Sequence, residues 1–285
     1  MIIYYTQSAS HLAPLLNLPL ESHKMAHFSD GEFLLEVGAV PPGKAIWVIG
    51  STLSPAQNSL ELFLLLDALA RAGATNISLL LLYFGYARQA LPKPGQANGA
   101  EFMCRILGQF PLHKIAILHP HNPQLLQQWL PHRNVIPFDF FITIARDYDA
   151  IVAPDTGAAG LAQTIAAQCG KEAIVLHKVR CHEQISTSLL TGDIANKKLL
   201  IVDDILATGS TITQAAKLLA DHGAQKIAAA VTHGLFSGNA HELLTTSPIT
   251  QIYVTNSVSQ IPRKNVTIYD TSHLLRTFFL PSGPS

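Results

Sequence analysis

Short apolar runs alternate with helix-length amphipathic runs along the first half of the chain. Ala45–Ile49 predicts a strand, Ser59–Ala72 a helix that ends before a glycine, and Ile77–Tyr83 a second strand. A helix at Gly99–Leu107 and a strand at Ile115–Leu118 continue the pattern. Because strands that alternate with helices pair in parallel, we expect a parallel sheet covered by helices on both faces.

The same alternation starts again after Pro137. We expect strands at Ala150–Ala153, Ala173–Leu176, Leu199–Val202 and Lys226–Thr232, and helices at Ala158–Gln168 and Thr211–His222. The segments Leu69–Ile77 (LARAGATNI) and Leu219–Ile227 (LADHGAQKI) align without a gap. This indicates a duplicated α/β unit, although a helix, a glycine cap and a strand also recur in unrelated α/β proteins. We place the boundary between two domains near Phe138 to Ile144, which divides the chain into 1–140 and 141–285.

Composition narrows the classes of function. The chain has 285 residues, 48% of them hydrophobic, so it can bury a large core, and its formal net charge of zero favours neither nucleic acid nor an anionic membrane. Its first residues lack a basic segment followed by a long apolar one, and no apolar run reaches the length of a membrane span, so we expect a cytoplasmic protein. Cys104, Cys169 and Cys181 are too few and too irregular for a disulfide framework, and we expect inert thiols.

The segment Asp203–Thr211 carries the strongest chemical signal, DDILATGST. Amide groups of a tight loop at a helix N-terminus favour a phosphate, and the hydroxyls of Thr208, Ser210 and Thr211 add donors. Two adjacent carboxylates at a strand end can accept hydrogen bonds from the vicinal hydroxyls of a sugar. The segment therefore predicts a site for a phosphorylated ribose. The alternative is an ordinary strand-to-helix turn, with Ser210 as the helix N-cap and Asp203 exposed.

This loop resembles the phosphoribosyl-binding signature of phosphoribosyltransferases and ribose-phosphate pyrophosphokinases, also called PRPP synthases. Segments spread over nearly the whole chain select the pyrophosphokinases: FSDGE at 28–32, YFGYARQ at 83–89, APDTGAAG at 153–160 and THGLFSG at 232–238. The length is most similar to that of the shorter, archaeal-type members. The resemblance implies two similar phosphoribosyltransferase-type domains, each a mainly parallel sheet flanked by helices. Domain 1–140 would bind nucleotide and domain 141–285 ribose 5-phosphate, with the last residues able to pack back on the first domain.

The resemblance also implies a reaction and its site residues. ATP would give its pyrophosphoryl group to the C1 hydroxyl of ribose 5-phosphate, with Mg²⁺ as cofactor, yielding PRPP and AMP. The expected ATP contacts are Phe28, Asp30, Gly31, Glu32, Arg88, Gln89 and His119, and the metal contacts His119 and Asp155. The expected contacts of ribose 5-phosphate are Arg180, Asp203, Asp204, Ala207, Thr208, Gly209, Ser210 and Thr211. In the family a neighbouring subunit contributes Asp30 to Glu32, which implies a homo-oligomer, at least a dimer, with ATP at the interface.

Lys178 and Arg180 match the catalytic lysine and arginine that the family carries on a mobile loop. Phosphoryl transfer develops negative charge on non-bridging oxygens, which cations stabilise. The alternative is a solvated basic edge. For His119 the alternative is a structural hydrogen-bonding role, and with His121 it would form only a partial metal site.

Two departures concern the nucleotide side. Ala90 and Leu91 follow the YARQ run where the family continues with Asp and a basic residue, and Ile117 replaces an acid two residues before His119. These departures motivate a second hypothesis, a catalytically weak paralogue that binds or regulates a true PRPP synthase. A third is a kinase of another phosphorylated pentose. A phosphoribosyltransferase is disfavoured, because the chain carries a full second α/β half with nucleotide-type motifs.

Overall fold

The computed structural model describes residues 1–89, 92–181, 184–188 and 194–279. For residues 178–181 and 184–188 it describes the backbone only. The chain forms two compact units, which we describe separately. Unit 1 comprises Met1–Ile136, Ser257–Ser259 and the chain from Ser272, and unit 2 comprises Pro137–Asn256 and Gln260–Thr271. Both are built from a parallel sheet and helices, which confirms the predicted α/β class.

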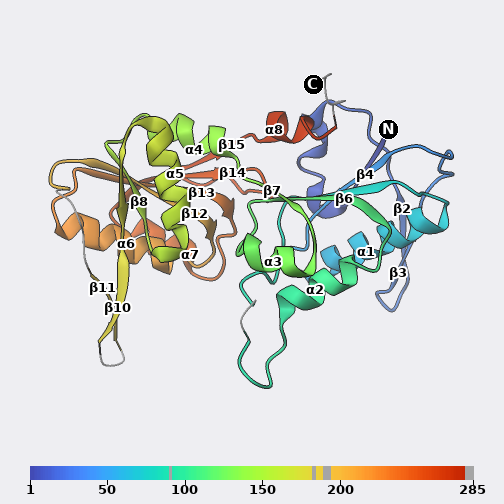
Figure 1. Ribbon diagram of the computed structural model, residues 1–285, viewed down its shortest axis with the longest axis horizontal. Coiled ribbons are helices and arrows are strands. Elements are labelled where there is room, and N and C mark those ends of the chain that lie inside the picture. The colour runs from blue at the N-terminus through green and yellow to red at the C-terminus, as the bar shows by residue number, and fades with distance from the viewer. Residues whose placement is uncertain (90–91, 182–183, 189–193, 280–285) are drawn as a thin grey trace. The chain divides into compact units, whose positions relative to one another are not determined.

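The sheet of unit 1 has the strand order β1-β4-β5-β6-β7, with every neighbouring pair parallel. Its strands are β1 (Ile2–Tyr5), β4 (Ile46–Gly50), β5 (Ile77–Leu81), β6 (Leu112–Leu118) and β7 (Arg133–Val135). Its helices are α1 (Ala56–Arg71), α2 (Gly99–Leu107), α3 (Pro123–Trp129) and α8 (Ser272–Arg276), with short 3₁₀ turns η1 (Gln7–Ala9) and η2 (Ala13–Leu16). An antiparallel hairpin, β2 (Lys24–His27) and β3 (Phe33–Glu36), extends from this unit (Figure 1).

The helix α1 shows why this sequence folds as it does. Leu62, Leu65, Leu66 and Leu69 recur at helical spacing, and all four side chains are fully buried in the core beside strands β4 and β5. The helix ends at Arg71, and two residues later Gly73 has a φ of 88°, which is easily reached only by glycine. The amide of Ala74 then bonds the carbonyl of Leu69 at 3.0 Å. After α8, Phe279 joins a second core of unit 1 with Ile3 and Leu118.

The sheet of unit 2 has the order β15-β14-β13-β12-β8-β9, again with parallel neighbours. Its strands are β8 (Ala150–Ala153), β9 (Glu172–Val175), β12 (Lys198–Leu206), β13 (Lys226–Gly234), β14 (Ile249–Thr255) and β15 (Val266–Tyr269). Its helices are α4 (Phe138–Ala145), α5 (Ala159–Cys169), α6 (Ser210–Asp221) and α7 (Ala240–Thr245), with the 3₁₀ turn η3 (Thr156–Ala158). The antiparallel hairpin of β10 (His177–Cys181) and β11 (Gln184–Ser188) projects from this unit in Figure 1.

The repeated segment has the same backbone geometry in both units. Gly223 closes α6 with a φ of 83°, and the amide of Ala224 bonds the carbonyl of Leu219 at 3.1 Å, as Ala74 bonds Leu69 in unit 1. The order of unit 2 differs because β9 lies on the far side of β8. After β8 the chain adds β9 on one side of it and then places β12 on its other side. The strand order therefore reverses between β8 and β12.

The predicted helices and strands are all present, with ends displaced by a few residues. One displacement affects the site. The strand predicted to end at Val202 continues to Leu206, because β13 is long enough to pair with it up to Gly234. None of the helices in the described ranges is long and apolar enough to cross a membrane.

Candidate functional site

Three carboxylates lie at the carboxyl ends of two neighbouring strands of unit 2. Asp155 follows β8, and Asp203 and Asp204 belong to the last part of β12, beyond its pairing with β8. Each position is fixed locally: Asp155 accepts a hydrogen bond from the amide of Gly157 at 3.0 Å, and Asp203 accepts one from the amide of Asp204 at 2.9 Å. Open α/β sheets bind ligands outside the carboxyl ends of strands where the strand order reverses, which is where these acids lie.

The three acids interact electrostatically. Burial raises the pKa of Asp203 well above its ordinary value, and the neighbouring charges of Asp204 and then Asp155 raise it further. Hydroxyl groups that donate hydrogen bonds, or a nearby cation, would stabilise the ionised form of this carboxylate.

The same acids are candidate ligands of a magnesium ion. Within the described ranges, no group of three or more His, Cys, Asp or Glu side chains forms a ready metal cage. Mg²⁺ is usually bound by one or two carboxylates together with waters and substrate phosphates, so a complete protein cage is not required. Asp155 and Asp203, whose charges interact, have the chemistry that such a partial site needs.

The loop after the acids leads into the N-terminus of α6. Gly209 is the N-cap, with a φ of 77°, and Ser210 is the first helical residue. Among the described residues no side chain caps this end, and the hydroxyls of Thr208 and Ser210, both exposed, lie 3.0 Å apart. Two details of the plain-turn alternative differ in the structure: Gly209 is the N-cap in place of Ser210, and Asp203 is partly buried. The helix end is left open to an anion.

The segment after β13 is hydrogen-bonded to the start of this loop. The amides of Leu235 and Ser237 bond the carbonyls of Leu206 and Ala207 at 2.8 and 2.9 Å. The guanidinium of Arg263 lies 4.4 Å from the ring centre of Phe236, between these two contacts. The sequence singled out the THGLFSG segment by resemblance, whereas nothing in the sequence pointed to Arg263.

Unit 1 lacks this acidic site. The repeat matches Ile77 with Ile227, and the strand registers then match Ile46 with Leu199 and Ile2 with Ala150. Counting along the strands, the counterparts of Asp155, Asp203 and Asp204 are Gln7, Gly50 and Ser51. The three acids of unit 2 therefore have no acidic counterparts in unit 1.

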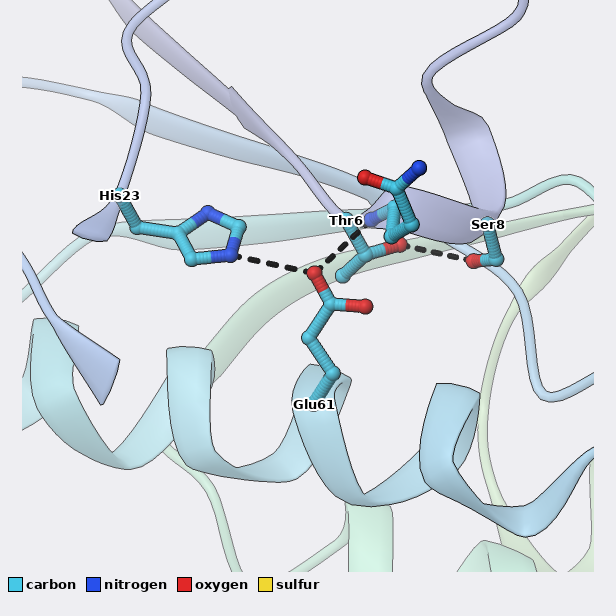
Figure 2. A network of polar contacts seen from close by, with 5 residues as sticks. Thr6, Ser8, His23 and Glu61 are labelled. Atoms are coloured by element: carbon cyan, nitrogen blue, oxygen red, sulfur yellow. Dashed lines mark hydrogen bonds and ion pairs between the residues drawn. The ribbon is translucent and has the colours of Figure 1, made fainter. Parts of the chain in front are cut away.

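Unit 1 instead places a carboxylate of its own at the corresponding strand end, as Figure 2 shows. Oε1 of Glu61 accepts a hydrogen bond from the amide of Gln7 at 2.8 Å and lies 3.1 Å from Nε2 of His23. Beside them the hydroxyls of Thr6 and Ser8 lie 2.8 Å apart. Both His23 and Glu61 are almost fully buried. Because His23 directly precedes β2, this pair also ties the base of the β2–β3 hairpin to α1.

The expected nucleotide contacts at Phe28–Glu32 form the tip of that hairpin. The amide of Phe28 bonds the carbonyl of Glu32 at 2.8 Å, and the amide of Glu32 bonds the side chain of Asp30 at 3.1 Å. Gly31 has a φ of 94°, which this tight turn requires. All five residues are exposed, and the ring of Phe28 is 54% exposed.

Arg88, Gln89 and His119 follow the carboxyl ends of two adjacent strands of unit 1. Arg88 and Gln89 are exposed beyond β5, whereas His119 is buried at the end of β6 with a φ of 38° and bonds Val135 through its amide at 2.8 Å. Ile117 is fully buried in the core. His119 belongs to unit 1 and Asp155 to unit 2, so the two expected metal ligands come from different units.

Lys178 and Arg180 lie in β10, opposite Thr187 and Ile185 of β11. Their side chains, like Ala90 and Leu91, lie outside the part of the chain that the structure describes. Of the cysteines, Cys104 is deeply buried, and burial raises the pKa of its thiol to about 12, which suits an inert role.

The chain matches two family models: the N-terminal domain of ribose phosphate pyrophosphokinase over residues 4–110, and the phosphoribosyl synthetase-associated domain over residues 163–276. It is 31% identical to the ribose-phosphate pyrophosphokinase of Caldanaerobacter subterraneus subsp. tengcongensis over 267 residues, covering 90% of this chain and 84% of that protein. It is 33% identical to the Chlorobaculum tepidum protein of the same name over 258 residues, covering 88% and 80%.

The fold is similar to that of phosphoribosylpyrophosphate synthetase from Mycobacterium smegmatis, with a TM-score of 0.84, 23% identity, and coverage of 97% of this chain and 96% of that one. The first two relatives share more than 30% identity with this chain over most of both chains. This chain belongs to the ribose-phosphate pyrophosphokinase family.

Proposed function

We propose that this protein transfers a pyrophosphoryl group from ATP to the C1 hydroxyl of ribose 5-phosphate and releases AMP. The single observation that carries the proposal is the site of unit 2, in which three carboxylates and an uncapped helix N-terminus lie at the reversal point of the sheet. The names of the relatives agree with this chemistry. The oxygen of the C1 hydroxyl attacks the β-phosphorus of ATP and loses its proton to solvent. The bond between the β-phosphorus and the α–β bridging oxygen breaks, and AMP leaves with that oxygen.

The two halves of the unit 2 site suit the two ends of ribose 5-phosphate. The phosphate would lie at the N-terminus of α6, within reach of the amides of Ala207 to Thr211 and the hydroxyls of Thr208, Ser210 and Thr211. The acid pair Asp203 and Asp204 would accept hydrogen bonds from the ring hydroxyls. The substrate would thereby have a fixed orientation, which is the main requirement in phosphoryl transfer.

Asp155 would contribute to binding a magnesium ion, with phosphate oxygens of the substrates as further ligands. When bound, the ion neutralises charge on the phosphates.

ATP would be bound by the hairpin tip and by the carboxyl edge of unit 1. The exposed ring of Phe28 offers a stacking surface for adenine, and Asp30, Gly31 and Glu32 offer polar contacts. Arg88 and Gln89, exposed after β5, and His119 would contact the rest of the nucleotide. We further propose that the hairpin tip serves a neighbouring copy of the chain, so that the active protein is a homo-oligomer. We place it in the cytoplasm.

Lys178 and Arg180 supply positive charge. On β10 they would stabilise the negative charge that develops on the transferred group, and Arg180 would also contact ribose 5-phosphate. These two cations and the three carboxylates all belong to unit 2.

The test is AMP formation from ATP by the full chain, with and without ribose 5-phosphate and with and without magnesium. We expect AMP only when both are present. Folded protein that forms no AMP above background under these conditions refutes the proposal. Formation of ADP in place of AMP identifies the third candidate, a kinase of a phosphorylated pentose, and a panel of pentose phosphates then names its substrate.

A second candidate is a catalytically weak paralogue that binds or regulates a true PRPP synthase. It is favoured by one specific observation: the place of the family's acid before His119 is taken by Ile117, which is fully buried in the core of unit 1. Copurification with an active homologue, together with inactivity of the chain alone, favours this candidate. A fully active homo-oligomer refutes it.

A further inference from the structure

Thr52 and Ser51 hold the segment Tyr83–Gln89 through a set of buried hydrogen bonds. The amide of Thr52 bonds the carbonyl of Tyr83 at 3.1 Å, and the hydroxyl of Ser51 donates to the same carbonyl at 3.3 Å. The hydroxyl of Thr52 accepts a hydrogen bond from the amide of Gly85 at 2.7 Å. Ser51 and Thr52 are 2% and 1% exposed, so water does not compete for these bonds.

The fit between the two segments depends on shape as well as on hydrogen bonds. A Cβ atom at Gly85 would lie 2.2 Å from the carbonyl oxygen of Thr52, closer than any real contact. The segment that bears Thr52 is itself fixed, because the side chain of Asn58 in the first turn of α1 donates to the carbonyl of Leu53 at 3.0 Å. Thr52 is therefore a rigid support for Gly85.

The held segment leads directly into the expected nucleotide contacts. Tyr86 follows Gly85 with a φ of 64°, and its carbonyl accepts the amide of Gln89 at 2.8 Å, which closes a turn. Arg88 and Gln89 lie in this turn and are exposed. A turn that presents two side chains to a ligand must have a fixed backbone position where it begins. The hydrogen bond from the amide of Gly85 to Thr52 fixes that position.

Unit 2 has no such hydroxyl at the equivalent place. By the strand registers, the counterparts of Thr52 and Gly85 are Ile205 and Leu235. In unit 2 this region supports the loop before α6, whereas in unit 1 the same region supports the segment after β5. Because unit 2 has the same strand and helix plan without a hydroxyl at this position, the plan itself does not require the hydroxyl of Thr52.

We infer that Thr52 is a positioning residue for ATP, acting through the amide of Gly85 to fix the turn that carries Arg88 and Gln89; this inference rests on the proposed function. Thr52→Val keeps the shape of the side chain and removes the acceptor. We expect the Kd and the KM for ATP to rise about tenfold, while the KM for ribose 5-phosphate stays unchanged. Thr52→Ser, which restores the acceptor, should return both constants to the wild-type values.

The control is Thr250→Val, which removes a threonine hydroxyl that donates to the carbonyl of Ile227 at 3.0 Å in unit 2. ATP binding is measured by calorimetry and both KM values by AMP formation, and hydrogen exchange of the Gly85 amide reports the contact itself. That amide should exchange faster in Thr52→Val and at the wild-type rate in Thr250→Val. Should Thr52→Val fail to fold, Ser51→Ala removes a neighbouring contact and should raise the same constants by a smaller factor.

The inference is overturned if Thr52→Val binds ATP as the wild type does, or if Thr52→Ser is equally impaired. It is also overturned if Thr250→Val weakens ATP binding to the same extent, since this outcome means a general loss of stability. Its failure is separable from that of the proposed function. A wild-type chain that binds ATP but forms no AMP refutes the function and leaves the calorimetric test in force, and a chain that binds no ATP overturns this inference.

Discussion

At the scale of single residues, the main feature of the candidate site is a carboxyl group, Asp203, whose surroundings disfavour its charged form. Asp203 is partly buried beside Asp204 and near Asp155, and each of these features favours its protonated form. The sequence showed that the acids were present and adjacent. It did not show the burial or the approach of Asp155, because both depend on the pairing of β8 with β12.

The raised pKa of Asp203 makes a prediction about stability. Because the pKa of Asp203 is higher in the folded chain, its charged carboxylate destabilises the fold. This destabilisation is absent below the pKa that the group has in the unfolded chain, and it grows as the pH rises toward the pKa of the folded chain. Asp203→Asn removes the charge and keeps an oxygen that accepts the Asp204 amide. Without ligands, we expect its Tm at pH 7 to exceed that of the wild type by about 2–4 °C. This gain should shrink as the pH falls toward about 4. A lower Tm than that of the wild type at pH 7 contradicts this account.

Asp204 should act mainly in sugar binding. Asp204→Ala removes a charged acceptor for a ring hydroxyl, so we expect the KM for ribose 5-phosphate to rise about 10–100-fold with little change in the KM for ATP. Asp221→Ala, which removes an exposed acid at the end of α6, is the control and should leave both constants unchanged. An unchanged KM for the sugar in Asp204→Ala means that the hydroxyls are bound elsewhere.

At the scale of elements, the same strand and helix plan is used differently in the two units. The glycine caps at Gly73 and Gly223 were visible in the sequence because they follow a helix-length apolar run. The buried pair of His23 and Glu61 was not visible, since these residues are far apart in the sequence and neither belongs to a recognisable motif. The β2–β3 hairpin was also missed as an element, because its strands are short and mostly exposed and so lack an apolar alternation.

The buried pair predicts a difference between two acids of α1. Glu61→Ala leaves the Gln7 amide and His23 buried without their partner, and we expect a loss of about 3–5 kcal/mol in the free energy of unfolding. Asp67→Ala breaks an exposed pair with Arg71 on the same helix and should cost less than about 1 kcal/mol. Urea unfolding of the two variants measures both values. Equal losses would show that the network in Figure 2 contributes no more than a surface pair.

The β10–β11 hairpin should carry the catalytic cations. Lys178→Ala removes a charge needed in the transition state, and we expect kcat to fall about 10²–10³-fold while binding of ribose 5-phosphate is nearly unchanged. Lys217→Ala, which removes an exposed lysine of α6, serves as the control. Steady-state kinetics and calorimetry with ribose 5-phosphate separate the two effects. A kcat within a few-fold of the wild-type value rules out the role assigned to Lys178.

At the scale of the whole molecule, two units of one plan carry one acidic site. The repeated segment predicted a similar helix-to-strand unit in each half, and the sequence at Asp203–Thr211 predicted a loop before a helix, because both are local patterns. The difference between the units follows from long-range pairing: β9 beside β8 creates the reversal of strand order in unit 2, and Gln7, Gly50 and Ser51 replace the acids in unit 1. This asymmetry agrees with the proposal that unit 2 binds ribose 5-phosphate and unit 1 the nucleotide.

The most direct test of the central claim is the identity of the products. The full chain is incubated with magnesium, ribose 5-phosphate and ATP labelled in its β-phosphate, and the products are separated and identified by mass. We predict that the label moves to the sugar, which gains two phosphoryl groups in one step, and that the unlabelled nucleotide product is AMP. Label that stays on a nucleotide product such as ADP contradicts the claim.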